Sequence, residues 1–377
     1  MKQDRAVSLI LLLSRVSPPA EIIGTAERVI KEGIDWKRFC DLSMVHGVAP
    51  LIYKNIGSFS DLPEDVLNIL KSAYFHNLRD SLSAANELAG IVAALEEEGV
   101  DVVPVKGLLM TEELYGDIGL YPSADIDILV KREDVHRAAG TMKETGYDGE
   151  SGMDDFRLDN YQDVSFHKAG KKPVEMHTSL GKPRYFNLPW DFWWEDLREK
   201  DFDGRGYKVL SPEKTLVYAC MHLFGHGYSP LKFIVGVAEM LRIFSDVLRW
   251  DKLQEYSERY NIYQPMMLSL YLASKLLDAP IPPEIAGRLK TLSPKEEWIY
   301  KKIESYVFTG KVRFSRIMFL LTSLRSGLPE LVTYLVSWFF PPLKEVSYRY
   351  AVPLRSKKIF LYYLLNPVLL LSKKRNV

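Results

Sequence analysis

The chain is poor in cysteine and carries no net charge. Among its 377 residues only Cys40 and Cys220 are cysteines, and 49 basic residues balance 49 acidic ones. Two cysteines cannot build a disulfide framework or a cysteine-based metal site, so we expect a cytoplasmic protein in a reducing compartment. A neutral chain also lacks the electrostatic footprint of a non-specific nucleic-acid binder, which weighs against a polymer substrate.

Hydrophobic runs long enough to span a bilayer are lacking too. The apolar residues 331–343 and 359–371 near the C-terminus are too short, and Asn366-Pro367 interrupts the second run. Both runs are compatible with weak contact at the inner face of a membrane; the alternative is that they are helices packed on the rest of the protein. The N-terminal run of residues 9–13 has no cleavage site and is interpreted as part of an amphipathic helix.

What is present is typical of a globular protein with more than one packed unit. Hydrophobic residues make up 47% and charged residues 26%, and the length exceeds that of a usual single core. We predict an α+β fold, in which a mixed β-sheet core is flanked by largely helical N- and C-terminal regions. The predicted divisions are a helical N-terminal region (1–84), an α/β core (85–205), a helical domain (206–310) and a helical C-terminal tail (311–377).

Local signals mark several helices. Asp35 opens a helix that ends near His46, and a long helix from about Phe75 is expected to end at Gly99, a residue type that favours a left-handed cap. Ser211-Pro212 is a helix start, with serine as N-cap and proline at the first helical position. Further helices are predicted after Pro50, at 108–117 and at 132–145, with breaks at 225–230 and 280–283.

Four short segments have the spacing of strands. Residues 100–105 and 125–130 are apolar runs bounded by turn residues. Residues 161–168 and 173–180 alternate apolar and polar side chains on either side of the turn AGKK, so they predict an antiparallel hairpin. This hairpin and the two earlier strands predict a mixed sheet.

Asp125 and Asp127 are the most informative residues of the chain. At i and i+2 of a strand they point to one face, whereas Ile126 and Ile128 point to the other. Two carboxylates side by side on an apolar strand are unfavourable unless a cation lies between them. Mg²⁺ prefers such oxygen ligands, so the pattern predicts a divalent-metal site.

The order of these features resembles a known superfamily. The chain has a strand, Lys106-Gly107, a helix, Asp125-x-Asp127 on a strand and then Glu175 on a neighbouring strand. This order resembles that of nucleotidyltransferases related to DNA polymerase β. More narrowly, the chain resembles a bacterial family of uncharacterised nucleotidyltransferases, most strongly over residues 95–129 and less beyond Ile243. The segments that carry this likeness are WKRFCDLSMVHGVAPLIY, VPVKGLLMTEELYGD, ADIDILV, VEMHTSL and LSPEKTLVYACMHL.

The resemblance implies a reaction and its residues. The enzyme would transfer a nucleoside monophosphate from an NTP to a hydroxyl-bearing acceptor, a small molecule, protein or RNA, with release of pyrophosphate. Asp125, Asp127 and Glu175 would be the catalytic carboxylates and the ligands of two Mg²⁺ ions. Lys106 and Gly107 would bind the nucleotide phosphates.

His177 and Tyr121 complete the candidate residues. His177 shares a face with Glu175, so it either orients that carboxylate or contacts the acceptor; a satisfied, half-buried histidine is the alternative. Tyr121 stands where relatives often have an arginine, so a triphosphate contact is absent or comes from elsewhere. Lys-Gly also replaces the usual Gly-Ser turn. Tyr121 is the best support in the sequence for a second hypothesis, a catalytically degenerate binding or scaffold protein. A third hypothesis is a toxin-like transferase acting on RNA.

Two other clusters are better explained without catalysis. His222 and His226 are four residues apart in HLFGH, but the motif lacks the glutamate of a zinc protease and a third ligand. The aromatic residues Trp190, Phe192, Trp193 and Trp194 favour a plug between domains over a base-stacking platform.

The metal-site hypothesis requires two features of the structure. Glu175 must lie beside the two aspartates, and these carboxylates must not be neutralised by lysine or arginine inside a closed interior.

Overall fold

The computed structural model describes residues 4–57, 59, 62–149, 163–181, 186, 188–308, 336, 339–341, 343–350 and 352–372. The chain forms two compact units, residues 1–312 and 313–377. Part of the predicted hairpin, residues 161–162, lies outside the described residues. So do most of the apolar run 331–343 and the basic residues 373–375.

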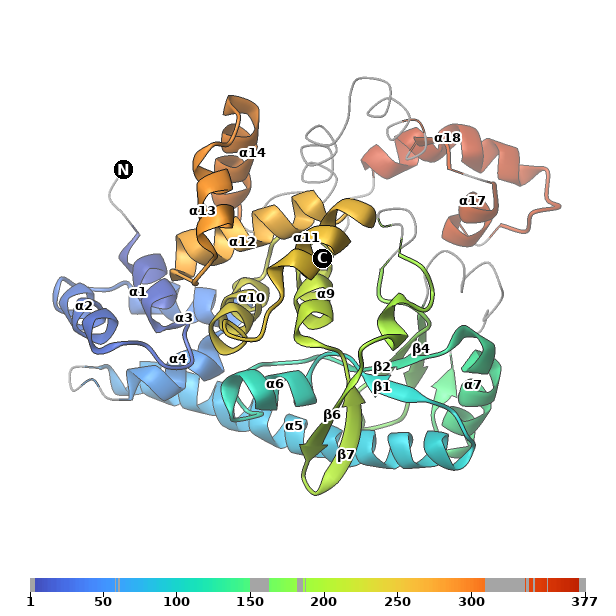
Figure 1. Ribbon diagram of the computed structural model, residues 1–377, viewed down its shortest axis with the longest axis horizontal. Helices are drawn as coiled ribbons and strands as arrows, with labels where there is room; N and C mark the ends of the chain where they lie inside the picture. The colour runs from blue at the N-terminus through green and yellow to red at the C-terminus, as the bar shows by residue number, and fades with distance from the viewer. Residues whose placement is uncertain are drawn as a thin grey trace. The chain divides into compact units, whose positions relative to one another are not determined.

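The first unit begins with a group of helices that pack on one another (Figure 1). Their starts follow from local chemistry, because the side chains of Asp4 and Asp35 accept hydrogen bonds from backbone N–H groups in the first turns of the helices that follow them. The helical prediction for this region and the helix opened by Asp35 are confirmed. These helices are α1 (Arg5–Leu13), α2 (Ala20–Lys31), α3 (Trp36–Val45) and α4 (Ala49–Ile56).

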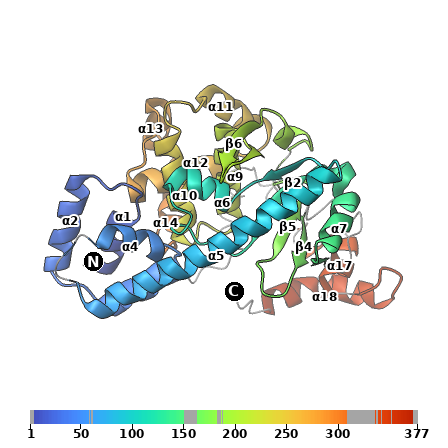
Figure 2. The same ribbon diagram turned by 90° about the horizontal axis from the view of Figure 1, so that it is seen from below.

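Helix α5 (Glu64–Glu97) is a single long helix on which the sheet packs. Its predicted end is confirmed, since Gly99 has φ +68° directly after the helix. The predicted start near Phe75 is wrong: the helix begins at Glu64, where Pro63 and the acidic first turn provide an N-terminal signal that was overlooked. Figure 2 shows α5 running unbroken along the first unit.

A five-stranded mixed sheet forms the centre of this unit, in the order β1-β2-β5-β4-β3. Strands β2 and β5 are parallel, and the other pairs are antiparallel, including the predicted β4–β5 hairpin. The predicted mixed sheet is therefore confirmed. The strands are β1 (Val102–Pro104), β2 (Ile126–Val130), β3 (Asp148–Gly149), β4 (Asp163–His167) and β5 (Val174–His177).

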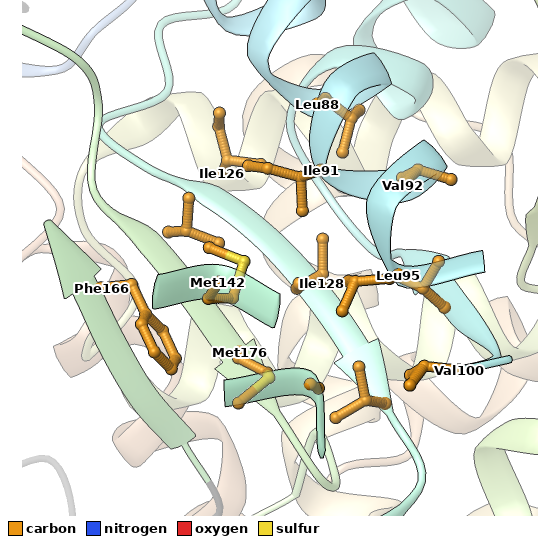
Figure 3. Close-up of a cluster of buried hydrophobic side chains, with 14 of the residues drawn as sticks. Leu88, Ile91, Val92, Leu95, Val100, Ile126, Ile128, Met142, Phe166 and Met176 are labelled. Atoms are coloured by element: carbon orange, nitrogen blue, oxygen red, sulfur yellow. The ribbon is translucent and has the colours of Figure 1, made fainter. Parts of the chain in front are cut away.

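One face of the sheet forms the hydrophobic core with two helices. Leu88 and Ile91 of α5 and Met142 of α7 (Val135–Glu144) pack against Ile128 and Met176 of the sheet (Figure 3). Because successive side chains in a strand alternate between faces, the polar residues of β2 and β5 lie on the other face. In Figure 1 helix α9 lies on that side of the sheet, away from α5.

A second, two-stranded sheet was not predicted. It consists of β6 (Arg198–Phe202) and β7 (Arg205–Val209), joined by Asp203-Gly204, both at positive φ. An Asp-Gly pair between alternating segments is a strong hairpin signal, so the sequence did contain the information. Tyr207 and Val209 join the core of the first unit.

The rest of the first unit is helical. Ser211 caps α9 by accepting a hydrogen bond from the Lys214 backbone N–H, with Pro212 at the first helical position, as predicted. The predicted breaks at 225–230 and 280–283 are also confirmed. The helices are α6 (Leu108–Tyr115) between β1 and β2, then α9 (Pro212–Gly225), α10 (Leu231–Ile243), α11 (Trp250–Arg259), α12 (Tyr263–Leu277), α13 (Pro283–Lys290) and α14 (Pro294–Glu304).

The second unit contains α17 (Leu343–Tyr350) and α18 (Lys358–Ser372). Val346, Val352 and Ile359 form its small hydrophobic core. Within the described residues, neither these helices nor any other is long and apolar enough to cross a membrane.

Candidate active site

Three polar side chains meet where β2 and β5 run in parallel. Asp127 is the direct neighbour of Glu175 in the register, and His177 lies two residues farther along β5. One ligand atom from each of these residues lies within 4.8 Å of the others. The demand that Glu175 lie beside the aspartates is therefore met for Asp127.

The two carboxylate oxygens of Asp127 differ in their surroundings. Oδ1 lies 2.9 Å from the ammonium nitrogen of Lys106 and 2.8 Å from Nε2 of His177. Oδ2 is buried and has no hydrogen-bond partner among the described residues. Burial alone would raise the pKa of Asp127, but His177 and Lys106 lower it to about 2. The side chain is thus an anion with one oxygen desolvated and uncompensated.

Asp125 lies at the edge of this group. It directly precedes β2, which begins at Ile126, so the predicted strand is one residue too long at this end. The Ser123 hydroxyl donates a 3.2 Å hydrogen bond to Asp125 Oδ1, and the Lys106 ammonium is 3.9 Å from Oδ2. Burial and the charge of Asp127 raise the pKa of Asp125. A cation between the two aspartates would relieve this repulsion.

Glu175 and His177 have different roles in the geometry. The Glu175 side chain is 34% exposed, and burial and the Asp127 charge raise its pKa. His177 Nε2 lies 3.7 Å from Glu175 but 2.8 Å from Asp127. Burial disfavours a charged His177, yet the hydrogen bond to Asp127 raises its pKa. His177 therefore orients mainly Asp127. Its interaction with Glu175, which the sequence predicted, is the weaker of the two.

Lys106 and Gly107 lie between β1 and α6. Gly107 has φ +70°, a backbone conformation that other residues rarely adopt, and it precedes the first turn of α6. The start of α6 thus offers backbone N–H groups close to Lys106. Burial opposes the charge of Lys106, but Tyr218, Asp127 and Asp125 raise its pKa.

Lys106 neutralises part of the negative charge of the aspartates. It pairs with Asp127 and approaches Asp125, so part of the negative charge is compensated. The interior is not closed, however, because the side chains of Asp125 and Glu175 are 22% and 34% exposed. With Asp127 Oδ2 still uncompensated, the condition that would reject the metal-site hypothesis is not fulfilled.

The donor set fits a hard divalent cation. The carboxylates of Asp127 and Glu175 lie together, and a buried carboxylate oxygen without a partner is an atom that a cation stabilises. Asp127 and Glu175 are best placed to hold Mg²⁺, with Asp125 beside them. His177 Nε2 already binds Asp127 and is better suited to positioning that ligand.

Sequence reasoning missed two lysines near this centre. Lys172 Nζ donates a 2.6 Å hydrogen bond to the Ser123 carbonyl, and Lys232 Nζ a 2.7 Å bond to the Pro122 carbonyl. The Lys232 ammonium also lies 5.4 Å from the centre of the Tyr121 ring. No motif spacing connects these lysines with residues 121–125, because they come from a hairpin turn and from the start of α10.

His222, in α9, and His226, directly after it, do not form a metal centre with other described residues. The rings of His222 and His226 are 4.4 Å apart and both pack against Phe233. Burial and the positive charge of Lys106 lower the pKa of His222 well below its usual value. In the described part of the chain, the one group of potential metal ligands is Asp127, Glu175 and His177.

The aromatic cluster is mainly interior packing. Phe192 and Trp193 are buried, and they pack against aromatic rings of α11 and α9. Trp190 is 39% exposed and lies beside Arg132. The buried pair is not accessible as a platform for a nucleobase.

A family model described as uncharacterised nucleotidyltransferase matches residues 32–278, well over half of the chain. The chain belongs to this family. No curated protein and no solved structure matches it. The predicted membership in a family of uncharacterised nucleotidyltransferases is therefore confirmed. Membership in the nucleotidyltransferase family supports a transferase that uses an NTP.

The matched range contains every candidate residue of the site. It covers β1, α6, β2 and β5, as well as the turn of Lys172 and the start of α10. Helices α13 and α14 and the second unit lie outside it. The group of potential metal ligands therefore lies within the residues that match the nucleotidyltransferase family.

Proposed function

We propose that the protein is a Mg²⁺-dependent nucleotidyltransferase with the core of the DNA polymerase β-like superfamily. It transfers a nucleoside monophosphate from an NTP to a hydroxyl group and releases pyrophosphate. The observation that carries the proposal is the buried, unpartnered Oδ2 of Asp127 beside Glu175 in the parallel register. Family membership supplies the nucleotide substrate.

Each residue has a role in this reaction. Asp125, Asp127 and Glu175 would hold two Mg²⁺ ions, which when bound supply electrostatic stabilisation of the charge that develops at the α-phosphorus. Glu175 accepts the proton of the acceptor hydroxyl, since its raised pKa makes it a stronger base than an exposed glutamate. The acceptor oxygen then bonds to the α-phosphorus, and the bond to the β-phosphate oxygen breaks.

The remaining residues position the substrate. Gly107 allows phosphate oxygens to approach the backbone at the start of α6, because it has no side chain in the way. Lys106 adds a positive charge next to the same place. His177 holds Asp127 in orientation through its hydrogen bond to Oδ1.

Labelling of an acceptor tests the proposal. The protein is incubated with Mg²⁺, cell extract and each NTP labelled at the α-phosphate, and labelled small molecules, proteins and RNA are identified. We expect Asp127→Asn to reduce labelling at least about 100-fold, the scale on which a preorganised electrostatic contact contributes to catalysis. Asp101→Asn is the control, since Asp101 pairs with Lys131 and Lys208 outside the site.

The outcomes separate the alternatives. Equal labelling by wild type and Asp127→Asn would remove the mechanism. Absence of NTP binding in calorimetry, with and without Mg²⁺, would instead favour the scaffold protein. A labelled RNA would identify the toxin-like transferase.

We also propose a cytoplasmic location with weak contact to a membrane surface. The support for the cytoplasm is that both cysteines are unpaired. The support for membrane contact is α18, where Phe360, Leu361, Leu364 and Val368 are more than half exposed beside Lys357 and Lys358.

A further inference from the structure

Two lysines from distant parts of the chain meet at the turn before Asp125. Lys172, in the turn between β4 and β5, binds the carbonyl of Ser123. Lys232, in the first turn of α10, binds the carbonyl of the preceding residue, Pro122. Both ammonium groups are therefore bound to the segment that leads into the metal-binding carboxylates. They are close enough for the charge of Lys172 to lower the pKa of Lys232.

Neither lysine has a carboxylate partner among the described residues. Other half-buried lysines of this unit do, as shown by Lys171 with Glu87 at 2.6 Å and Lys200 with Glu112 at 2.6 Å. Burial lowers the pKa of Lys172 and of Lys232. Asp80 acts against this lowering in Lys172, and the charge of Asp125 does so in both residues, which places both lysines near the acidic centre.

Aromatic rings direct the Lys232 ammonium. It lies 5.4 Å from the ring centre of Tyr121 and 5.0 Å from that of Phe233. The face of an aromatic ring attracts an ammonium group, and the N–H groups of that ammonium which point away from the ring stay available for an anion. Tyr121, which stands where an arginine was expected, thus helps to hold a lysine from another element at the same place.

The balance of charge indicates what the lysines bind. Three acidic groups face three lysines, but divalent ions on Asp125, Asp127 and Glu175 would neutralise the carboxylates. Lys232 would then be a partly buried cation without a carboxylate that compensates it, and Lys172 would keep the charge of Asp80, which raises its pKa. Such cations are stabilised by an anion with several negative charges and acceptor oxygens.

We propose that Lys172 and Lys232 bind the β- and γ-phosphates of the NTP and replace the absent arginine. The inference rests on the proposed function, because it takes the anion to be a triphosphate. Lys106 and the start of α6 would then be left for the phosphate that reacts.

Binding of inorganic triphosphate tests this inference directly. We measure its affinity for the full chain by calorimetry with Mg²⁺, for wild type, Lys172→Met and Lys232→Met. Methionine retains most of the apolar stem but removes the charge, so the packing is largely preserved. We expect each substitution to weaken binding about tenfold, the scale of one charge-assisted hydrogen bond. Binding of a nucleoside monophosphate and of Mn²⁺ should not change.

Three further variants show whether a loss of binding comes from the missing charge or from damage to the fold. Lys168→Met is the matched control, because Lys168 lies in the same hairpin and also binds a carbonyl, that of Thr145, but it has a carboxylate neighbour in Glu87. Lys172→Arg and Lys232→Arg keep the charge and should recover most of the affinity. If a methionine variant does not fold, the arginine variant and the triphosphate-to-monophosphate affinity ratio carry the test.

The result separates the inference from the proposed function. If wild type and both methionine variants bind triphosphate equally well, the inference is wrong, while acceptor labelling still decides the reaction. If binding depends on the lysines but no acceptor is ever labelled, the phosphate site stands and the transfer reaction falls. Absence of triphosphate binding by the wild type overturns the inference.

Discussion

Asp127 shows at the scale of single residues how one carboxylate serves two purposes. Oδ1 is fixed by Lys106 and His177, whereas Oδ2 is left for a cation. Because Lys106 is itself a cation on the same carboxylate, it competes electrostatically with a metal ion. Lys106, the proposed phosphate ligand, would therefore also weaken metal binding in the absence of nucleotide.

We predict that Lys106→Met tightens the binding of Mn²⁺ alone and lowers turnover. Removal of the competing charge should lower the Mn²⁺ dissociation constant by about tenfold, and the missing phosphate contact should reduce NMP transfer. Electron paramagnetic resonance of free Mn²⁺ measures the first effect. Lys131→Met is the control, as its partner is Asp101 outside the site. Weaker Mn²⁺ binding by Lys106→Met would show that the lysine orders the carboxylates rather than competing with the metal.

At the scale of elements, the position of Asp125 depends on how α5 holds the loop before β2. Asn77 of α5 donates a 2.8 Å hydrogen bond to the carbonyl of Gly119, and the Tyr74 hydroxyl donates a 2.9 Å bond to Asp117. A Cβ at Gly119 would lie 2.8 Å from the Tyr74 ring and 3.1 Å from Leu78 Cβ. The loop can approach α5 this closely because residue 119 has no side chain.

We expect two glycine substitutions to change stability in opposite directions. Gly119→Ala should lower the free energy of unfolding by about 2 kcal/mol, because the new methyl group meets α5. Gly90→Ala, at an exposed and open position inside α5, should raise it by about 1 kcal/mol through helix propensity. Urea unfolding measures both. A stable Gly119→Ala variant would mean that the loop moves away from α5 easily.

His46 links α3 to α10 at the residues next to Lys232. Its Nδ1 accepts a 3.1 Å hydrogen bond from the Leu231 N–H, and its carbonyl accepts one from the Lys232 N–H. Burial lowers the pKa of His46 from 6.5 to about 4. As the pH decreases, His46 of the unfolded chain binds a proton before His46 of the folded chain does. Protonation therefore stabilises the unfolded state, and the free energy of unfolding decreases.

We therefore predict a loss of stability between pH 6.5 and about 4 that depends on His46. From pH 7 to pH 5 the contribution should be about 2 kcal/mol, as the unfolded histidine is protonated while the folded one stays neutral. His46→Asn keeps an acceptor near the Nδ1 position but does not titrate in this range. The difference between wild type and variant in urea unfolding isolates the effect, and parallel pH profiles would contradict it.

At the scale of the whole molecule, the site belongs to the first unit alone. Residues 1–312 form one compact unit, and it contains the sheet, the carboxylates and the three lysines. The exposed apolar side chains of α18 belong to the second unit, residues 313–377. The two proposed activities, nucleotide binding and membrane contact, are thus carried by different units.

We expect a chain of residues 1–312 to keep the affinity of the full chain for Mn²⁺ and inorganic triphosphate. Its core and all proposed ligands are retained. The full chain should cosediment with anionic lipid vesicles, whereas residues 1–312 should not, because α18 is removed. Equal sedimentation of both chains would contradict the role of α18, and loss of Mn²⁺ binding would contradict the independence of the first unit.

Features that depend on neighbouring residues could be predicted from the sequence. Gly99 ends α5, Ser211-Pro212 starts α9, and the β4–β5 hairpin follows its turn, because caps and turns are local interactions. The family and the mixed sheet were also predicted correctly. The misses had local signals too: Pro63 before α5, and Asp203-Gly204 in the β6–β7 hairpin.

The sequence by itself determined that Asp127 and Glu175 lie on strands with their side chains on polar faces, since the alternation of a strand is a property of the chain. Only the tertiary structure decided that β2 and β5 are parallel neighbours, that His177 binds Asp127 rather than Glu175, and that Lys172 and Lys232 bind adjacent carbonyls before Asp125. Such contacts join residues tens of positions apart. They depend on how the elements pack, and no spacing along the chain encodes them.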